Sequence, residues 1–207
     1  MMRTKLSKII NLCIGVLVLF TWLSMTFRLG PLGAQSEGGF GNLRFFTVLT
    51  NLLQGGVSLA YFFGVRVGRW KYASTAAMAL TFCVVLFVLG PRRGYDVMYS
   101  GANFFSHLVV PVLAIVDFLV LDRTGSFTLR DSLFTMIPLA AYGLFYGGNL
   151  LINGVEGNDW YGFARGGPAA ALMIFAFALL LNWLIAVLLR LPRRAKADPV
   201  PPTLPGT

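Results

Sequence analysis

The chain has 207 residues, of which 57% are hydrophobic and 12% are charged, and its mean hydropathy is +0.72. Soluble domains carry about 25% charged residues, so this composition excludes an ordinary soluble globular protein. The net charge of +9 does not indicate nucleic-acid binding, because the basic residues flank apolar blocks and form no stripe interleaved with aromatic residues.

Six apolar blocks follow one another along the chain, separated by short polar breaks. Blocks of about 20 residues are typical of transmembrane helices, and the alternating segments of a β-barrel are not visible. We therefore predict an all-α, polytopic membrane protein built as a six-transmembrane-helix bundle. The predicted spans are residues 9–27, 44–65, 74–89, 103–121, 133–152 and 168–189, of which the third is the shortest.

The first block follows three basic residues, Arg3, Lys5 and Lys8, as the core of a secretory signal peptide does. Its apolar run is longer than the roughly 7–15 residues of such a core. We predict that it is retained as the first helix, with cleavage near Gly33 as the alternative.

Most of the 17 Lys and Arg residues lie before the first block, in residues 66–71 and 122–130, and after the last block. Lys and Arg are enriched in cytoplasmic connections, so we predict that both termini are cytoplasmic, with the inverted topology as the alternative. Residues 1–191 form the predicted transmembrane domain, and the Pro-rich residues 192–207 a disordered cytoplasmic tail. We expect a multi-pass protein of the plasma (inner) membrane, and the sequence does not predict its oligomeric state.

Two cysteines, Cys13 and Cys83, lie inside apolar blocks without the paired spacing of a metal or redox site. We therefore expect no metal and no organic cofactor.

A polar stripe runs along one face of the second predicted helix and contains Thr47, Asn51, Gln54 and Ser58. These side chains must face the bundle, because lipid cannot satisfy their hydrogen bonds. For Asn51, Gln54 and Ser58 the favoured interpretation is helix–helix hydrogen bonding, which such residues commonly provide in membranes.

The fourth predicted span contains His107, the only histidine of the chain. An ionisable residue inside a membrane indicates a functional site by default. The alternative is a structural histidine bonded to a backbone carbonyl or a tyrosine hydroxyl. Pro111 cannot donate the helical hydrogen bond to the His107 carbonyl, and this favours a kink beside the histidine.

Asp117 lies about 15 Å deeper than His107 on the same helix, too far away to orient the imidazole. We expect Asp117 to pair with Arg123 or with another cation at the inner end. Asn103 and Asp159 are better candidates for the group that orients His107.

Thr47 and His107 each lie about one turn inside the outer end of a predicted helix, so they share one level in the bundle. If the two helices are neighbours, the neutral imidazole can accept the threonine proton while the hydroxyl attacks a carbonyl. The oxyanion that forms needs donors, for which Asn51 or a nearby hydroxyl is a candidate. The residues expected to line the substrate cavity are Asn51, Asn103, Tyr142, Asn149 and Trp160.

Two features of the last helices predict packing. Gly143 and Gly147 form a GxxxG surface, which favours close approach of a neighbouring helix. Asn182 is isolated among apolar residues, so it needs a partner inside the bundle.

Several short motifs resemble those of the androgen-induced six-transmembrane family, which includes hydrolases of fatty-acid esters of hydroxy fatty acids. They are residues 44–47 (RFFT), 107–111 (HLVVP) and 159–163 (DWYGF). The prokaryotic branch, described as predicted six-transmembrane proteins, is more similar still, through residues 50–53 (TNLL) and 116–118 (VDF). The histidine-to-proline interval is one residue shorter than in the animal members, and Gly162 stands where their loop has proline.

The resemblance implies that Thr47 is a nucleophile and His107 its base, acting on a lipid-like ester drawn from membrane lipids. We therefore expect a membrane-embedded lipid-ester hydrolase. The alternative is a non-enzymatic membrane protein that binds or carries a lipid-like ligand; a carrier is the weaker form, because paired broken helices are missing.

Overall fold

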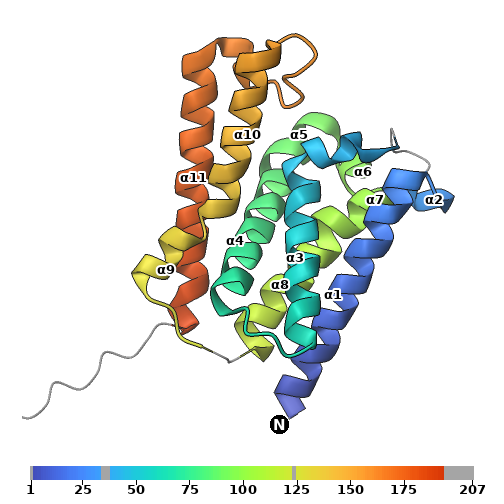
Figure 1. The fold of residues 1–207 in the computed structure, drawn as a ribbon, viewed down its shortest axis with the longest axis vertical. Coiled ribbons are helices and arrows are strands. Elements are labelled where there is room, and N and C mark those ends of the chain that lie inside the picture. Colours follow the sequence, from blue (N-terminus) through green and yellow to red (C-terminus); the bar gives the residue numbers. More distant parts are fainter. Residues whose placement is uncertain (1, 34–37, 123–124, 194–207) are drawn as a thin grey trace, which may run out of the picture.

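The computed structural model describes residues 2–33, 38–122 and 125–193, which form a helical bundle without a β-strand (Figure 1). Short 3₁₀ or π turns, labelled η, interrupt or extend several helices. In chain order the elements are α1 (Met2–Phe27), α2 (Gly30–Gly33), η1 (Phe40–Arg44), α3 (Phe46–Phe62), α4 (Gly68–Val84), η2 (Val85–Leu89), α5 (Gly90–Arg93), α6 (Tyr95–Met98), α7 (Gly101–Phe104), η3 (Phe105–Val109), α8 (Val110–Val116), η4 (Asp117–Leu121), α9 (Leu129–Phe134), α10 (Ile137–Asn153), η5 (Phe163–Gly166), α11 (Pro168–Arg190) and η6 (Leu191–Arg193).

Five helical segments within the described ranges are long and apolar enough to cross a membrane. They are Met2–Phe27, Gly68–Arg93, Gly101–Leu121, Leu129–Asn153 and Pro168–Arg193. The remaining predicted span corresponds to α3, whose 17 residues lie at the lower limit of what a bilayer requires. The helical fold and the apolar spans are those of an integral membrane protein.

The exposed surface of the last two helices supports this class. Leu151 in α10 is 88% exposed, and Leu172 and Phe177 in α11 are 70% and 66% exposed. A soluble protein seldom leaves so much contiguous apolar surface in water, whereas lipid tails solvate it without cost.

The third span was expected over residues 74–89 as the shortest, and this expectation is wrong. The helical segment runs from Gly68 to Arg93, over 26 residues. Lys71 was assigned to a polar break because of its charge. It is buried within α4 and paired with carboxylates of another segment, so the charge does not end the helix.

Two buried clusters hold the bundle together. Ile14 and Val18 of α1 pack with Met78 of α4 and with Val110 and Ala114 of α8. A second cluster joins α4, η4 and α11, and consists of Tyr72, Ala76, Ala79, Phe118, Phe127, Ala186 and Leu189. In Figure 1, α10 and α11 form a pair beside the group of α1, α3, α4 and α8.

The beginning of α1 and the end of η6 lie at the same end of the bundle (Figure 1). Arg193 was assigned to the disordered tail, but it belongs to η6 and only 6% of it is exposed. The Arg193 side chain finds buried partners there, among them the Phe118 carbonyl. The rest of the predicted tail, residues 194–207, lies outside the described part of the chain.

The helix-packing predictions are confirmed in part. A Cβ atom added to Gly143 would overlap the ring of Phe175 in α11, so this glycine is a close-packing position. Gly147 has open space around it, so the second half of the GxxxG motif is not used. Asn182 finds its buried partner, since its Nδ2 donates to the carbonyl of Thr135 at 3.0 Å.

Candidate functional site

Helix α3 lies directly against η3, the helical turn that carries His107. The Nδ2 group of Asn51 donates both to the Thr47 carbonyl at 2.8 Å and to the Ser106 carbonyl at 3.1 Å. One buried amide therefore ties the turn that carries Thr47 to the residue before His107. The helices of the two predicted catalytic residues are neighbours.

His107 is buried, and its Nδ1 atom lies 2.9 Å from the carbonyl oxygen of Met98. A carbonyl only accepts hydrogen bonds, so Nδ1 carries the proton and Nε2 of the neutral ring carries the lone pair. A bond to a backbone carbonyl is what the structural alternative for His107 expected, and the same tautomer is the one that a general base requires at Nε2. The residue lies in a π-helical turn just before Pro111, and such turns occur frequently at functional sites.

The orienting group of His107 differs from the two that the sequence suggested. The Nδ2 group of Asn103 donates to the Val97 carbonyl at 3.4 Å instead. Asp159 lies in the loop between α10 and α11 and bonds groups of that loop and of α10. The Met98 carbonyl takes this role because α6 folds back over η3. The sequence allowed a backbone carbonyl as the partner of His107, but no residue pattern shows which carbonyl it is.

Thr47 is the second residue of α3 and is partly buried. It lies close to the loop between α10 and α11, residues 154–167, which contains Tyr161 and is called the outer loop below. Among the residues that the structure describes, no hydrogen bond joins Thr47 to His107. Catalytic hydrogen bonds are often long without substrate and shorten in the reacting complex.

Tyr161 reaches from the outer loop to the beginning of α3. Its hydroxyl oxygen accepts the backbone N–H of Phe46 at 2.9 Å. The Thr47 hydroxyl is a further hydrogen-bonding neighbour, which lowers the pKa of the Tyr161 phenol. Burial raises the pKa of the Tyr161 phenol, and its hydrogen-bonding neighbours offset this only in part. The phenol therefore keeps its proton at neutral pH.

The outer loop is held in shape by Asp159. Its carboxylate accepts the backbone N–H groups of Phe163 and Ala164, each at 2.9 Å, and the Tyr146 hydroxyl. Burial alone would raise the pKa of Asp159, but these hydrogen bonds outweigh it and hold the pKa below its usual range. Gly162, with φ 74°, makes the left-handed turn that directs Tyr161 inward.

Two more of the predicted cavity residues meet at this end of the bundle. The Tyr142 hydroxyl donates to the Arg44 carbonyl at 2.8 Å, and Trp160 Nε1 donates to the Tyr142 oxygen at 3.0 Å. The Oδ1 atom of Asn149 accepts a hydrogen bond from Asn153 at 2.9 Å, while its own amide nitrogen is buried without a partner among the described residues. The structure thus brings Thr47, Asn51, Tyr142 and Trp160 to one end of the bundle and adds Tyr161. Asn103 and Asn149 have local hydrogen-bond partners.

A groove of about 250 Å³ runs between α3 and α10 below this polar group. Its outer end is formed by Phe46 and Tyr142, and Thr50 is the only hydroxyl deeper in it. The lining residues are Phe46, Leu49, Thr50, Leu53, Pro138, Ala141, Tyr142 and Phe145. Apart from the hydroxyls of Thr50 and Tyr142, the side chains that line the groove are apolar.

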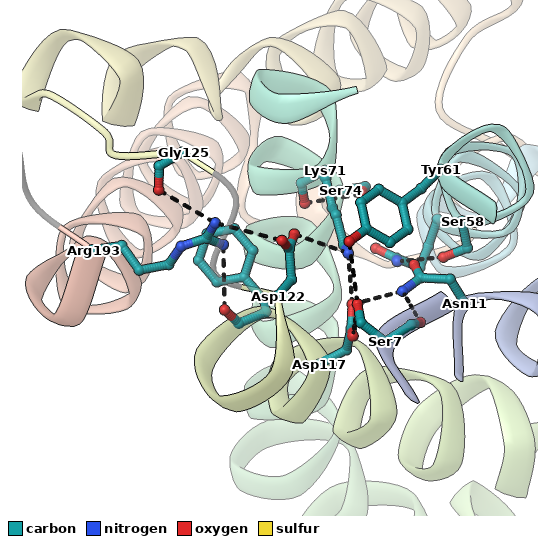
Figure 2. Close-up of polar contacts among 12 residues, drawn as sticks. Ser7, Asn11, Ser58, Tyr61, Lys71, Ser74, Asp117, Asp122, Gly125 and Arg193 are labelled. Atoms are coloured by element: carbon teal, nitrogen blue, oxygen red, sulfur yellow. Dashed lines mark hydrogen bonds and ion pairs between the residues drawn. The ribbon is translucent and has the colours of Figure 1, made fainter. Parts of the chain in front are cut away.

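Asp117 belongs to a separate polar network at the opposite end of the bundle (Figure 2). Its carboxylate accepts the Ser7 hydroxyl at 2.6 Å and the Asn11 amide at 2.7 Å, and lies 2.6 Å from Lys71 Nζ. The expected pairing of Asp117 with a cation is confirmed, with Lys71 as the partner. Arg123 lies outside the described residues.

The same network continues to the end of the described chain (Figure 2). Lys71 Nζ also lies 3.0 Å from Asp122, which in turn lies 4.0 Å from Arg193. The Arg193 guanidinium donates to the Phe118 and Gly125 carbonyls. Two cations and two carboxylates balance one another here, which is how buried charges are tolerated. The arrangement ties α1, α4, η4 and η6 together.

The described residues contain no cluster of three or more His, Cys, Asp or Glu side chains that could hold a metal ion. Comparison with known proteins gives no match to a family model, a curated protein or a solved structure. The functional argument therefore depends on the geometry of the residues themselves.

Proposed function

We propose that this protein is a six-span hydrolase of the plasma membrane that cleaves a lipid-like ester, with Thr47 as nucleophile and His107 as base. In this proposal α3 is the sixth span and both termini are cytoplasmic. The observation that carries the function is the Asn51 amide, which joins the Thr47 carbonyl to the Ser106 carbonyl beside His107. The hydrogen bond from His107 Nδ1 to the Met98 carbonyl at 2.9 Å is the one expected of a structural histidine, and it is also compatible with a base. It leaves Nε2 as the proton acceptor of a histidine held beside the helix of Thr47.

The substrate class follows from the surroundings of Thr47. The groove between α3 and α10 is largely apolar, and its lining includes Phe46, the residue before Thr47. An acyl chain in this groove would place its ester near the polar outer end, where Thr47 lies. A long-chain ester dissolved in the membrane fits both requirements.

The reaction would proceed by acyl transfer to Thr47. The Thr47 oxygen attacks the ester carbonyl carbon while its proton moves to His107 Nε2, and the carbonyl electron pair forms an oxyanion. Collapse of the oxyanion expels the alcohol, which takes the proton from the imidazolium. Water then attacks the acyl-threonine by the same route and releases the fatty acid, with Thr47 and His107 restored.

The test is labelling of the purified protein in lipid nanodiscs by a fluorophosphonate probe, which reacts with activated hydroxyl nucleophiles. We expect labelling of the natural protein and its loss in Thr47→Ala and His107→Ala. Thr21→Ala is a matched control, because that buried hydroxyl only donates to carbonyls of its own helix. Absence of labelling, or labelling that survives both substitutions, contradicts the hydrolase proposal.

Lipid binding without catalysis is the second candidate. The groove favours it, because this apolar site is complete without any contribution from Thr47 or His107. Co-purification of a lipid that Leu53→Trp displaces, together with no labelling by the probe, would support binding over hydrolysis.

A further inference from the structure

The oxyanion of the proposed reaction needs a hydrogen-bond donor, and the sequence suggested Asn51 or a nearby hydroxyl. The structure argues against Asn51. Its Nδ2 group already donates to the Thr47 and Ser106 carbonyls, and its other polar atom, Oδ1, is an acceptor. A donor aimed at developing negative charge must come from another residue.

Tyr161 is the hydroxyl that the fold delivers to this position. It comes from the outer loop, more than a hundred residues away in the sequence, and its oxygen accepts the Phe46 N–H at 2.9 Å. Thr47 is the next residue, and its hydroxyl is one of the hydrogen-bonding neighbours that lower the pKa of the Tyr161 phenol.

The Tyr161 side chain is held rigidly. Its ring stacks on Phe163 at a centroid distance of 5.1 Å and meets the edges of Phe45 and Tyr146 at 6.2 and 5.9 Å. The Asp159 carboxylate fixes the loop on either side of it. Such preorganisation is what allows a donor to stabilise a transition state without first having to move.

We propose, on the basis of the hydrolase function above, that Tyr161 is a further catalytic residue whose phenolic O–H donates a hydrogen bond to the oxyanion formed when Thr47 attacks the ester. No proton is transferred from Tyr161. The phenol stabilises the negative charge while the tetrahedral intermediate exists and returns to its resting contacts when the carbonyl re-forms.

Burial of Tyr161 agrees with this role. Because its pKa is raised, the phenol is protonated throughout the neutral range and remains a donor. The Phe46 N–H is only a donor, so it occupies a lone pair of the Tyr161 oxygen and not the phenolic proton, whose hydrogen-bonding neighbours at rest are the Tyr142 and Thr47 hydroxyls.

The experiment compares Tyr161→Phe with the natural protein in nanodiscs, using hydrolysis of p-nitrophenyl palmitate. Removal of one oxyanion donor lowers kcat on the order of a hundredfold, and we expect KM to change little because the aromatic ring remains. Activity of the natural protein should also fall at strongly alkaline pH as the phenol ionises, and Tyr161→Phe should lose this alkaline limb.

Tyr95→Phe is the matched control, since the Tyr95 hydroxyl also lies at the outer end but bonds the Leu86 carbonyl away from Thr47. If Tyr161→Phe lowers thermal stability, raises KM and keeps the alkaline limb, its hydroxyl only caps α3 and the inference is overturned. Unchanged kcat in Tyr161→Phe, with activity lost in Thr47→Ala, overturns the role of Tyr161 alone. Activity that survives Thr47→Ala overturns the hydrolase proposal itself.

Discussion

Lys71 and Asp117 form an ion pair of 2.6 Å with side chains that are only 3% and 1% exposed. The ammonium also lies 3.6 Å from the ring centre of Tyr61 in α3. This cation therefore connects α4 to η4 and to α3. Because the charges are out of water, either partner without the other is far more costly than the intact pair.

Lys71→Met is expected to lower the free energy of unfolding by about 3–5 kcal/mol, because it leaves the Asp117 carboxylate buried and without its cation. Unfolding of the protein in mixed detergent micelles measures this change. Arg69→Met is the matched control on the same helix: Arg69 pairs with Asp131 while 68% exposed, and exposed pairs contribute about 1 kcal/mol or less. Equal losses in the two variants would refute a special role for the buried pair.

Gly143→Ala is expected to destabilise the α10–α11 pair by about 1–3 kcal/mol, the usual range for overpacking. The added methyl group would overlap the Phe175 ring, whereas the same change at Gly147 meets no atom within 4 Å. Thermal unfolding in detergent should therefore separate Gly143→Ala from a nearly neutral Gly147→Ala. If Gly143→Ala is as stable as the natural protein, the Phe175 ring can move aside and the prediction is contradicted.

Asn51→Leu should reduce fluorophosphonate labelling at least tenfold, because the amide that connects Thr47 to the segment of His107 is lost. Its effect on stability should be about 0.6–1.7 kcal/mol, the range for hydrogen bonds between membrane helices. Asn182→Leu removes a similar bond to the Thr135 carbonyl, far from the site. Asn182→Leu should lower stability by a similar amount and leave labelling intact. If the two variants are labelled equally, the role of Asn51 is contradicted.

The outer loop should remain ordered from neutral pH down to the usual range of a carboxyl group and loosen only in stronger acid. The pKa of Asp159 is lowered in the folded protein, so its stabilising effect is present above the unfolded pKa and is lost as pH falls through the folded pKa. Fluorescence of a variant that retains only Trp160 measures this transition. Asp159→Asn should show a loosened loop at neutral pH and no acid transition; an identical acid transition in both proteins would exclude Asp159 as its cause.

The helical membrane class and the approximate positions of the spans follow from the sequence alone. Hydropathy over about 20 residues is a local property, and the bilayer selects helices of that length whatever their neighbours are. The same reasoning placed Thr47 and His107 at one depth. It misplaced the start of the third span, because the charge of Lys71 becomes compatible with a buried helix only when distant carboxylates compensate it.

The tertiary structure decided which groups meet. The Met98 carbonyl orients His107, Lys71 of α4 pairs with Asp117, and Tyr161 reaches the beginning of α3. Each of these contacts joins segments whose approach depends on helix packing and on loop conformation. A backbone carbonyl or a buried ion partner leaves no periodic pattern in the sequence, so these contacts become visible only in the packed bundle.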